Sequence, residues 1–435
     1  MTDAVPEPEQ ARRLPRGFLL LLTGQSVSLV GSAVTLLALP LTAIDLLSAG
    51  PFQTGVLLAC GRAPYLLCGP VAGVLVDRWS HRTLLMSANT AMALVLATVP
   101  VTALTGHLSL PHLYVAATVV GTATVLADVA YLACVPTVVP SAQLVQAQSR
   151  LELGQSIAVA LGPPLAGWLI GAFSPPTAIF ADAASFLLAT ALLPYVAMRP
   201  LPRPSAALTT GGIVTEAAEG ARFLLRTARL RAVTLATATS VFCYNAYAAV
   251  FLLYLTGHLG FSAYETGAAM GVGAAGGVAG ALIARSLARV LGLGRVLVAG
   301  LLLSASGALV APAIATTGRP ALLGIALSQF LLWTGQQIYN VHQVPVRYAL
   351  TPPALYGRIN ASIRTVVWGL APVGALLGGA CGTWFGTRTT LALSGGFMAL
   401  ATVWIARSPL WSARTAQLEP LAQESDAGTP RPTVS

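Results

Sequence analysis

Long uninterrupted apolar segments constrain this chain more than any other feature. Residues 17–44 read GFLLLLTGQSVSLVGSAVTLLALPLTAI and contain no charged side chain. About 20 consecutive apolar residues are enough for a helix to cross the hydrocarbon core of a bilayer. Only 9% of the 435 residues are charged, against about a quarter in soluble domains. The chain is therefore predicted to be an all-α membrane protein with several spanning helices.

Breaks at Pro, Gly and charged residues divide the sequence into twelve apolar windows. The first window is too long for a signal peptide and lacks a small-residue cleavage site, so we expect it to be retained as a helix. The twelve windows predict spanning helices over residues 17–46, 54–76, 83–105, 112–138, 150–172, 176–197, 231–256, 265–287, 295–315, 321–347, 359–384 and 389–409.

The placement of Arg predicts the orientation of these helices. All 24 basic residues are Arg. With both termini in the cytoplasm, 20 of them fall in cytoplasmic segments, and only Arg319 and Arg388 fall in outer loops. Such a bias is typical of membrane proteins, so the net charge of +10 needs no nucleic-acid partner. Without Lys the chain has no Walker A loop and no Schiff-base lysine. It has no HExxH or CxxC motif either, and we expect no enzymatic activity, no metal and no cofactor.

The two halves of the sequence repeat one design. The segment GVLVDRWSHR (73–82) aligns with GALIARSLAR (280–289), which pairs Gly73 with Gly280 and Arg82 with Arg289. Six spans followed by six more is the layout of transporters built from repeated bundles. The predicted parts are a cytoplasmic tail (1–16), a six-helix bundle (17–198), a linker with a basic amphipathic helix (199–230), a second six-helix bundle (231–409) and a cytoplasmic tail (410–435). We expect the amphipathic helix to lie on the membrane surface.

Several motifs resemble the major facilitator superfamily. The pattern Gly73-x-x-x-Asp77-Arg78-x-x-x-Arg82 resembles its loop 2–3 signature, with Ser80 in place of the usual second Gly. GPPLAG (162–167) resembles the span-five signature of its drug/proton antiporters, although Ala158 replaces an upstream Gly. DVAYLACVPTVV and ADAASFLLATALL are similar to the bacterial macrolide-efflux-like and enterobactin-exporter-like branch. The resemblance covers roughly residues 17–409 and implies two six-helix bundles that work by alternating access.

The resemblance also implies a cytoplasmic gate. In the family, the loop 2–3 Asp lies at the start of span eleven, where a carboxylate meets the free N–H groups and positive dipole end of a helix. The implied gate residues are Gly73, Asp77, Arg78, Arg82 and Arg358. In span five, Gly162, Pro163 and Gly167 form the Gly-Pro signature. This motif has two possible explanations, close packing between helices and a specific role in antiport.

Spans 1, 4, 7 and 10 line the central cavity in the family. In span ten, polar and aromatic residues recur in steps of 4, 3 and 4, which places them on one face of a helix. The candidate substrate contacts are Gln25, Ser32, Tyr244, Asn245, Gln329, Trp333, Gln336 and Asn340. A cavity with aromatic walls and few hydrogen-bonding groups suits a bulky, partly apolar organic solute. Polar contacts between helices are the alternative explanation of these stripes.

A carboxylate within span four is the candidate for proton coupling. Asp128 lies about 24 Å from the outer end of its span at 1.5 Å per residue, near mid-membrane. It could exchange protons, anchor a cationic substrate, or have a structural role, paired with Arg62 or hydrogen-bonded to Tyr131. By contrast, Asp45 and Asp182 are expected near outer helix ends, where hydration is cheap.

These features together predict a transporter that exports a small organic compound, such as a drug or secondary metabolite, in exchange for protons. Such an activity would connect the chain to multidrug resistance. Its expected partners are the substrate, protons and membrane lipids, and we expect a monomer in the bacterial plasma membrane. An uptake symporter of the same fold and a non-transporting membrane receptor or partner subunit are the alternatives.

Overall fold

Helices lie over all twelve predicted windows. The computed structural model describes residues 14–67, 79–198, 222–351 and 356–411, and every regular element in these ranges is a helix. The helices are α1 (Arg16–Leu47), α2 (Pro51–Leu67), α4 (His81–Leu104), α5 (Leu110–Val138), η2 (Ser141–Gln143), α6 (Leu144–Ala172), α7 (Pro175–Leu192), η3 (Leu193–Tyr195), α9 (Ala228–Leu253), η4 (Tyr254–His258), α10 (Ala263–Leu291), α11 (Leu293–Ala313), α12 (Arg319–Ala349), α13 (Tyr356–Phe385), α14 (Thr387–Ala399) and α15 (Ala401–Ala406).

Ten of these helical segments are long and apolar enough to cross a membrane. The helix α2 is outside this set because its described part has 17 residues, and α12 is outside it although it has 31 residues. A row of Gln, Asn and His side chains lowers the hydropathy of α12. The prediction of an all-α membrane protein is thus confirmed.

Packing divides the chain into two compact units. The first unit consists of Met1–Leu39 and Leu67–Ser205, and the second of Pro40–Leu66 and Ala206–Ser435. The predicted division of the sequence into two six-helix repeats, 17–198 and 231–409, stays a prediction. In the packed chain, α2 and the end of α1 group with the second unit, and α1 passes from one unit to the other at Pro40.

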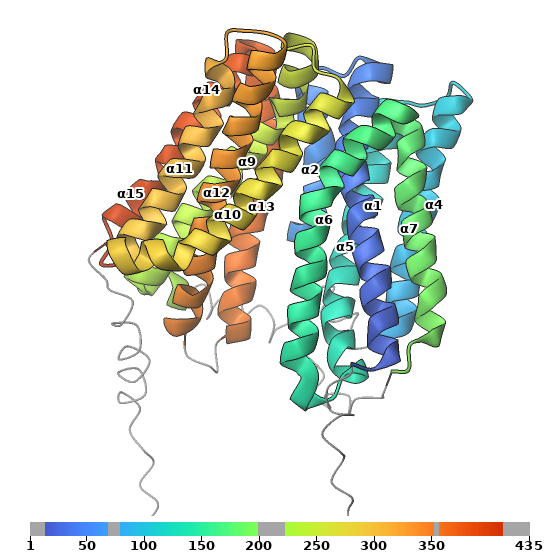
Figure 1. Cartoon of the computed structure of the whole chain (residues 1–435), viewed down its shortest axis with the longest axis horizontal. Helices are drawn as coiled ribbons and strands as arrows, with labels where there is room; N and C mark the ends of the chain where they lie inside the picture. The colour runs from blue at the N-terminus through green and yellow to red at the C-terminus, as the bar shows by residue number, and fades with distance from the viewer. Residues whose placement is uncertain (1–13, 68–78, 199–221, 352–355, 412–435) are drawn as a thin grey trace, which may run out of the picture. The chain divides into compact units, whose positions relative to one another are not determined.

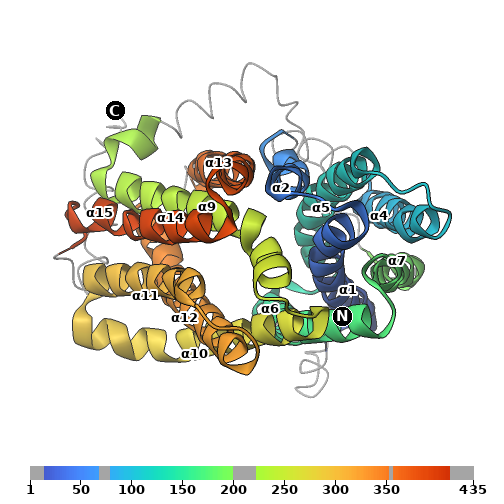
Figure 2. The ribbon, with the colours of Figure 1, turned by 90° about the horizontal axis from the view of Figure 1, so that it is seen from above.

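The first unit is built around α4, which packs along both α5 and α7 (Figures 1 and 2). Its core lies near the end of the bundle where α1 and α4 begin. There Phe18, Leu84, Tyr131, Cys134 and Leu193 are buried together from α1, α4, α5 and η3. Because lipid tails are as apolar as these side chains, van der Waals packing is what holds such a cluster together in a membrane.

The second unit repeats this arrangement. In Figure 2, α11 and α12 lie next to each other, and α11 also packs on α14. In the order of spans, α11 is the third helix of its half and contacts the fourth and the sixth, as α4 does in the first unit. The helix α9 packs on α13 and α14. This shared packing supports the internal repeat inferred from the two matching loops.

Close contacts hold α2 in the second unit. A Cβ atom on Gly55 would lie 2.6 Å from the carbonyl oxygen of Ala375 and 2.9 Å from Cα of Gly379, so the backbones of α2 and α13 touch at this glycine. The Thr54 hydroxyl donates to the carbonyl of Ala249 on α9 at 2.9 Å. Small residues permit this kind of approach between membrane helices.

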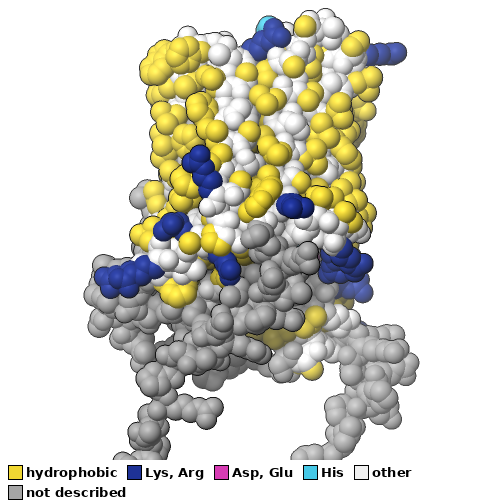
Figure 3. Space-filling model, turned by 90° about the vertical axis from the view of Figure 1, so that its left-hand side faces the viewer, with side chains coloured by type: hydrophobic (Ala, Val, Ile, Leu, Met, Phe, Trp, Pro, Cys, Tyr) yellow, Lys and Arg dark blue, Asp and Glu magenta, His cyan; other side chains and the backbone are white. Residues whose placement is uncertain are grey.

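The outer surface of the second unit fits a lipid environment. Figure 3 shows hydrophobic side chains over the height of one face, with Arg side chains gathered mainly toward its lower end. Exposed apolar residues on α10, α11 and α12 include Leu282, Leu302 and Leu323. In water such a continuous apolar surface would be unfavourable, whereas acyl chains solvate it.

The predicted amphipathic segment before α9 lies only partly within the described residues. Most of the linker, residues 199–221, lies outside the described ranges. Leu224 is buried in a cluster with Ile359 and Ile363 of α13, and Phe223 packs against the same cluster. Phe223 and Leu224 therefore contact α13, and the position of the segment on the membrane surface stays a prediction.

Candidate functional site

The helix α5 carries the predicted coupling carboxylate. Asp128 is half-buried. Tyr131, one turn further on, is only 8% exposed, and its buried hydroxyl has no hydrogen-bond partner. The predicted hydrogen bond between Asp128 and Tyr131 is therefore wrong. Arg62, the other proposed partner of Asp128, has its guanidinium over the ring of Trp368, 5.9 Å from the ring centre.

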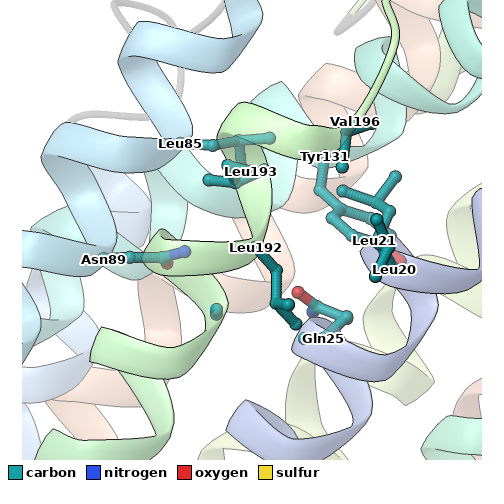
Figure 4. A pocket seen from close by; sticks show the side chains of 11 residues that line it. Leu20, Leu21, Gln25, Leu85, Asn89, Tyr131, Leu192, Leu193 and Val196 are labelled. Carbon is teal, nitrogen blue, oxygen red and sulfur yellow. The ribbon is translucent and has the colours of Figure 1, made fainter. Parts of the chain in front are cut away.

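A small pocket opens beside Tyr131 within the first unit. Figure 4 shows Gln25 from α1, Asn89 from α4 and Tyr131 from α5 among the residues that line it. The other lining residues are apolar, with Leu21 and Leu85 on opposite helices. Gln25, which we predicted as a substrate contact, thus lies at a cavity between helices of its own unit.

The acid on α7 contradicts its prediction. Asp182 is 1% exposed, not hydrated at a helix end. Its carboxylate oxygen Oδ2 accepts a hydrogen bond of 2.5 Å from the Thr35 hydroxyl on α1. Ser32 also hydrogen-bonds to this carboxyl, so one predicted substrate contact has Asp182 as its partner. The sequence correctly gives the position of Asp182 along α7. It does not show that α1 covers the side chain and keeps it from water.

The Gly-Pro segment of α6 packs closely on α1. A Cβ atom on Gly162 would lie 2.4 Å from Cβ of Ala33, so this contact requires glycine. Gly167 is buried in the same helix, and Pro163 is one of two prolines inside it. These contacts support the packing explanation of the motif. A role of its own in antiport stays a prediction.

The implied gate lies largely outside the described residues. Gly73, Asp77 and Arg78 fall between residues 68 and 78. Arg358 lies in the first turn of α13. Arg82 donates a hydrogen bond of 2.5 Å from Nη2 to the carbonyl of Val196, at the end of the first unit. The part of Arg82 in the implied gate stays a prediction.

In the second unit, α9 and α12 face each other with polar and aromatic side chains. Gln329 is 4% exposed and donates from Nε2 to the Tyr247 hydroxyl at 3.4 Å. Tyr244 and Trp333 meet edge to face, with ring centres 5.8 Å apart. One turn away, the Ser240 hydroxyl donates a long hydrogen bond of 3.5 Å to the side-chain oxygen of Gln336.

Asn245, also on α9, has a polar side chain that is only partly hydrogen-bonded. It is buried, and its Nδ2 donates to the carbonyl of Val241 at 2.8 Å. Its buried Oδ1 accepts no hydrogen bond. Asn340, further along α12, is half-buried. A buried carbonyl oxygen without a donor costs about 1–3 kcal/mol, and a bound solute or water with a donor would remove this cost.

Other ionisable groups have structural partners. His342 lies on α12 with its Nδ1 2.8 Å from the carbonyl of Ile338, one turn earlier. Glu152 is exposed and accepts a hydrogen bond from Gln148 on the same helix. Among the described residues, no group of three or more His, Cys, Asp or Glu side chains is placed to hold a metal ion.

Sequence reasoning missed the residues that complete these clusters. Tyr247 and Ser240 bond the predicted Gln side chains, and Asn89 lines the pocket with Gln25. Ser240, Tyr244 and Tyr247 follow at steps of four and three, so helical spacing on α9 could have found Tyr247. The signal for Asp182 was its spacing of three from Ser185 in an otherwise apolar helix.

Comparison with known proteins agrees with the fold. The sequence profile of the Major Facilitator Superfamily matches residues 21–372. The uncharacterised MFS-type transporter YfiS of Bacillus subtilis is 25% identical over 393 residues, which cover 88% of this chain and 91% of YfiS. A second uncharacterised MFS-type transporter, from Mycobacterium tuberculosis, is 35% identical over 111 residues, a quarter of each chain.

Solved structures share the fold at low sequence identity. The nucleoside transporter NupG superposes with a TM-score of 0.74 at 11% identity, covering 90% of this chain and 99% of NupG. A bacterial homologue of the iron transporter ferroportin, in an inward-facing state, gives 0.71 at 16% identity, with 92% and 99% covered. PepTSo, a POT family transporter, gives 0.73 at 13%, with 95% and 99% covered.

Proposed function

Since this chain belongs to the major facilitator superfamily, we propose that it exports a small organic compound in exchange for protons. The observation that carries the proposal is the polar and aromatic face shared by α9 and α12. The rings of Tyr244 and Trp333 offer apolar and π contacts, and Gln329 and Gln336 offer a few hydrogen bonds. Binding sites for small molecules combine apolar walls with a few placed polar groups in this way.

The chemistry of this face favours an organic solute over a metal cation. Neither α9 nor α12 contains an Asp or Glu residue. Hard cations prefer carboxylate and carbonyl oxygens, usually with several carboxylates. The buried Oδ1 of Asn245 would accept a hydrogen bond from a hydroxyl or amine of the solute. The likeness to the ferroportin homologue is therefore one of fold.

The proposal includes Asp128 as the residue that exchanges protons. A carboxylate inside a membrane helix is costly and usually functional. Export, and not uptake, follows from the resemblance of the span-four, span-five and span-six motifs to efflux proteins. We further propose that the chain resides as a monomer in the bacterial plasma membrane with both termini in the cytoplasm. Reporter fusions at each terminus and the mass of the detergent-solubilised protein test these points.

Transport in liposomes tests the function. The purified protein is reconstituted into vesicles with an acidic interior and a luminal pH dye. A hydrophobic cationic dye, a macrolide and a catecholate siderophore are then added one at a time. For an antiporter, entry of the solute releases luminal protons, and the interior becomes more alkaline. Transport of none of the three classes would contradict the proposed export of such compounds.

Matched carboxylate variants test the coupling. Asp128→Asn should abolish proton release during solute entry, whereas Asp45→Asn should leave it unchanged because Asp45 is exposed at the end of α1. Proton movement in the same direction as the solute would favour the uptake symporter. Wild-type coupling in Asp128→Asn would exclude this residue as the proton carrier.

A further inference from the structure

A buried carboxyl group lies at the contact of α1 with α7, apart from the α9 and α12 face and from Asp128. Asp182 is 1% exposed. It is the eighth residue of α7, about 10 Å along the axis from the first residue of the helix. Its contacts are hydroxyl groups: Thr35 at Oδ2, Ser185 at Oδ1 at 3.2 Å, and Ser32. Ser28 extends this polar row with a bond to the Ser185 carbonyl at 3.5 Å.

The hydrogen atoms of this cluster can be counted. Thr35 has one hydroxyl hydrogen, which it donates to Oδ2 of Asp182. Ser185 also has one, and its shorter contact, 2.7 Å, is to the backbone carbonyl of Asp182. The second contact of Ser185, 3.2 Å to Oδ1, is longer, and a proton on Oδ1 would supply the hydrogen for it. A protonated Oδ1 donates to the Ser185 oxygen and completes both bonds.

No positive charge faces Asp182 within the described residues. On α1, Arg16 is 19 residues before Thr35, about 28 Å along the axis, and Asp45 is ten residues after it. On α4, Arg82 bonds to Val196, which is 14 residues past Asp182. The remaining charged or titratable groups on helices next to α7 lie at the far ends of their helices: His81, Arg150 and Glu152.

Burial decides the protonation state in such a setting. An isolated carboxylate moved out of water costs several kcal/mol even after relaxation, and a proton or a cation must compensate it. The separation of 2.5 Å between the Thr35 and Asp182 oxygens is that of a hydrogen bond, and the 3.2 Å contact of Ser185 with Oδ1 is a longer one. Gly31 of α1 lies against the same carboxyl group. A Cβ atom on Gly31 would be 2.7 Å from Oδ1 of Asp182 and 2.4 Å from Oγ of Ser185. A proton fits this site without any rearrangement.

We propose that Asp182, Ser185, Thr35 and Ser32 form a proton-binding site, and that Asp182 holds its proton on Oδ1 in this structure. When α1 separates from α7, the proton passes from Oδ1 to a water molecule. The carboxylate left behind accepts hydrogen bonds from Ser185 on its own helix and from water. Five residues after Thr35, α1 continues through Pro40 into the second unit. Because proline removes a backbone hydrogen bond, α1 can bend there, and proton release is linked to that motion.

Infrared spectroscopy of the purified full chain without substrate tests the bound proton. The chain has only 14 Asp and Glu residues, so a single protonated carboxyl can be resolved by its C=O stretch. At neutral pH this band should be present, shift in D₂O, and disappear in Asp182→Asn. Asp45→Asn, which changes an exposed carboxyl group, should leave it intact. Asp182→Glu should retain a band at a shifted frequency.

Two variants of glycine provide a second test if Asp182→Asn fails to fold. Gly31→Ala places a methyl group against Ser185 and Asp182, so the band should shift or broaden. Gly171→Ala, which adds a methyl group with no atom within 4 Å, should leave the band unchanged. A spectrum with no protonated carboxyl at neutral pH, or a band unaffected by Asp182→Asn, would overturn the proposal. A band that vanishes only when Na⁺ is added would identify a cation site instead and would also overturn it.

The link between this site and transport rests on the proposed function and is tested separately. In the liposome assay, Asp182→Asn should reduce solute-driven proton release at least tenfold, and Asp182→Glu should restore part of it. If the infrared band is present but the wild type moves no protons, the antiport proposal fails and the proton site stands. If protons move in the wild type and equally in Asp182→Asn, the linkage to transport fails.

Discussion

The contact of α10 with α12 allows a quantitative test of helix packing. Gly273, Gly276 and Gly280 form a stripe on α10 at helical spacing, and each meets α12. At the centre, a Cβ atom on Gly276 would lie 2.4 Å from the carbonyl oxygen of Phe330 and 2.9 Å from its Cα. The carbonyl of Gly276 also accepts a hydrogen bond of 2.9 Å from the Thr334 hydroxyl. The neighbouring Gly277 has no atom within 4 Å of the same position.

Gly276→Ala and Gly277→Ala therefore differ in packing but not in backbone propensity. Each variant gains up to about 1 kcal/mol of helix propensity. In Gly276→Ala the two helices must separate by about 1 Å to reach ordinary contact distance, since backbone atoms cannot rotate away. Overpacking of this kind costs about 1–3 kcal/mol, and stretching the Thr334 bond adds about 0.5–1.5 kcal/mol. We expect a difference of about 2–4 kcal/mol between the variants.

Thermal unfolding in detergent measures this difference. For a unit of this size, 1 kcal/mol corresponds to about 2–4 °C in Tm, so Gly276→Ala should unfold roughly 5–15 °C below Gly277→Ala. Gly277→Ala should match or slightly exceed the wild type. The Thr334→Val variant, which removes only the hydrogen bond, should fall between them. Equal Tm values for the two alanine variants would refute the argument that backbone contact, and not glycine content, sets the stability here.

Three further predictions concern single side chains. Tyr131→Phe removes a buried hydroxyl without a partner and should leave Tm unchanged or raise it. Tyr339→Phe loses a 2.7 Å bond to Thr237 and should lower the stability by about 1 kcal/mol. Equal changes in stability of the two variants in a denaturation series would contradict this prediction. Gly162→Ala should lower Tm because of Ala33, and Gly171→Ala should not; a stable Gly162→Ala would show that α6 moves freely. Ser262→Ala breaks the capping box of α10 and should cost about 1 kcal/mol; unchanged hydrogen exchange in the first turn would exclude the cap.

Sequence reasoning was accurate where local pattern decides the outcome. Apolar windows located the twelve helices, because membrane helices satisfy their backbone hydrogen bonds within one segment. The steps of 4 and 3 on α12 correctly joined Gln329, Trp333 and Gln336, which share one face toward α9. Whether a solute binds this face is a prediction that the packing alone does not test.

The same reasoning failed where a distant segment decides. Asp182 lies near the start of its helix, and hydration follows from that position alone. Its burial comes from Thr35 and Gly31 on α1, about 150 residues earlier. Likewise, the contact of Gly55 on α2 with Gly379 on α13 joins two segments that are far apart in the sequence. Neither contact has a signature in a single window.

The position of α2 has a consequence for how the protein is made. Gly55 packs against Gly379, which the ribosome adds 324 residues later. At about 5–20 residues per second, α2 waits roughly 15–65 s in the membrane before α13 exists. During that time its glycine face has no final partner, so lipid or the insertion machinery must shield it. Biogenesis of this transporter should thus be most vulnerable in this interval, and strains that slow translation between α2 and α13 should lower its yield more than its stability.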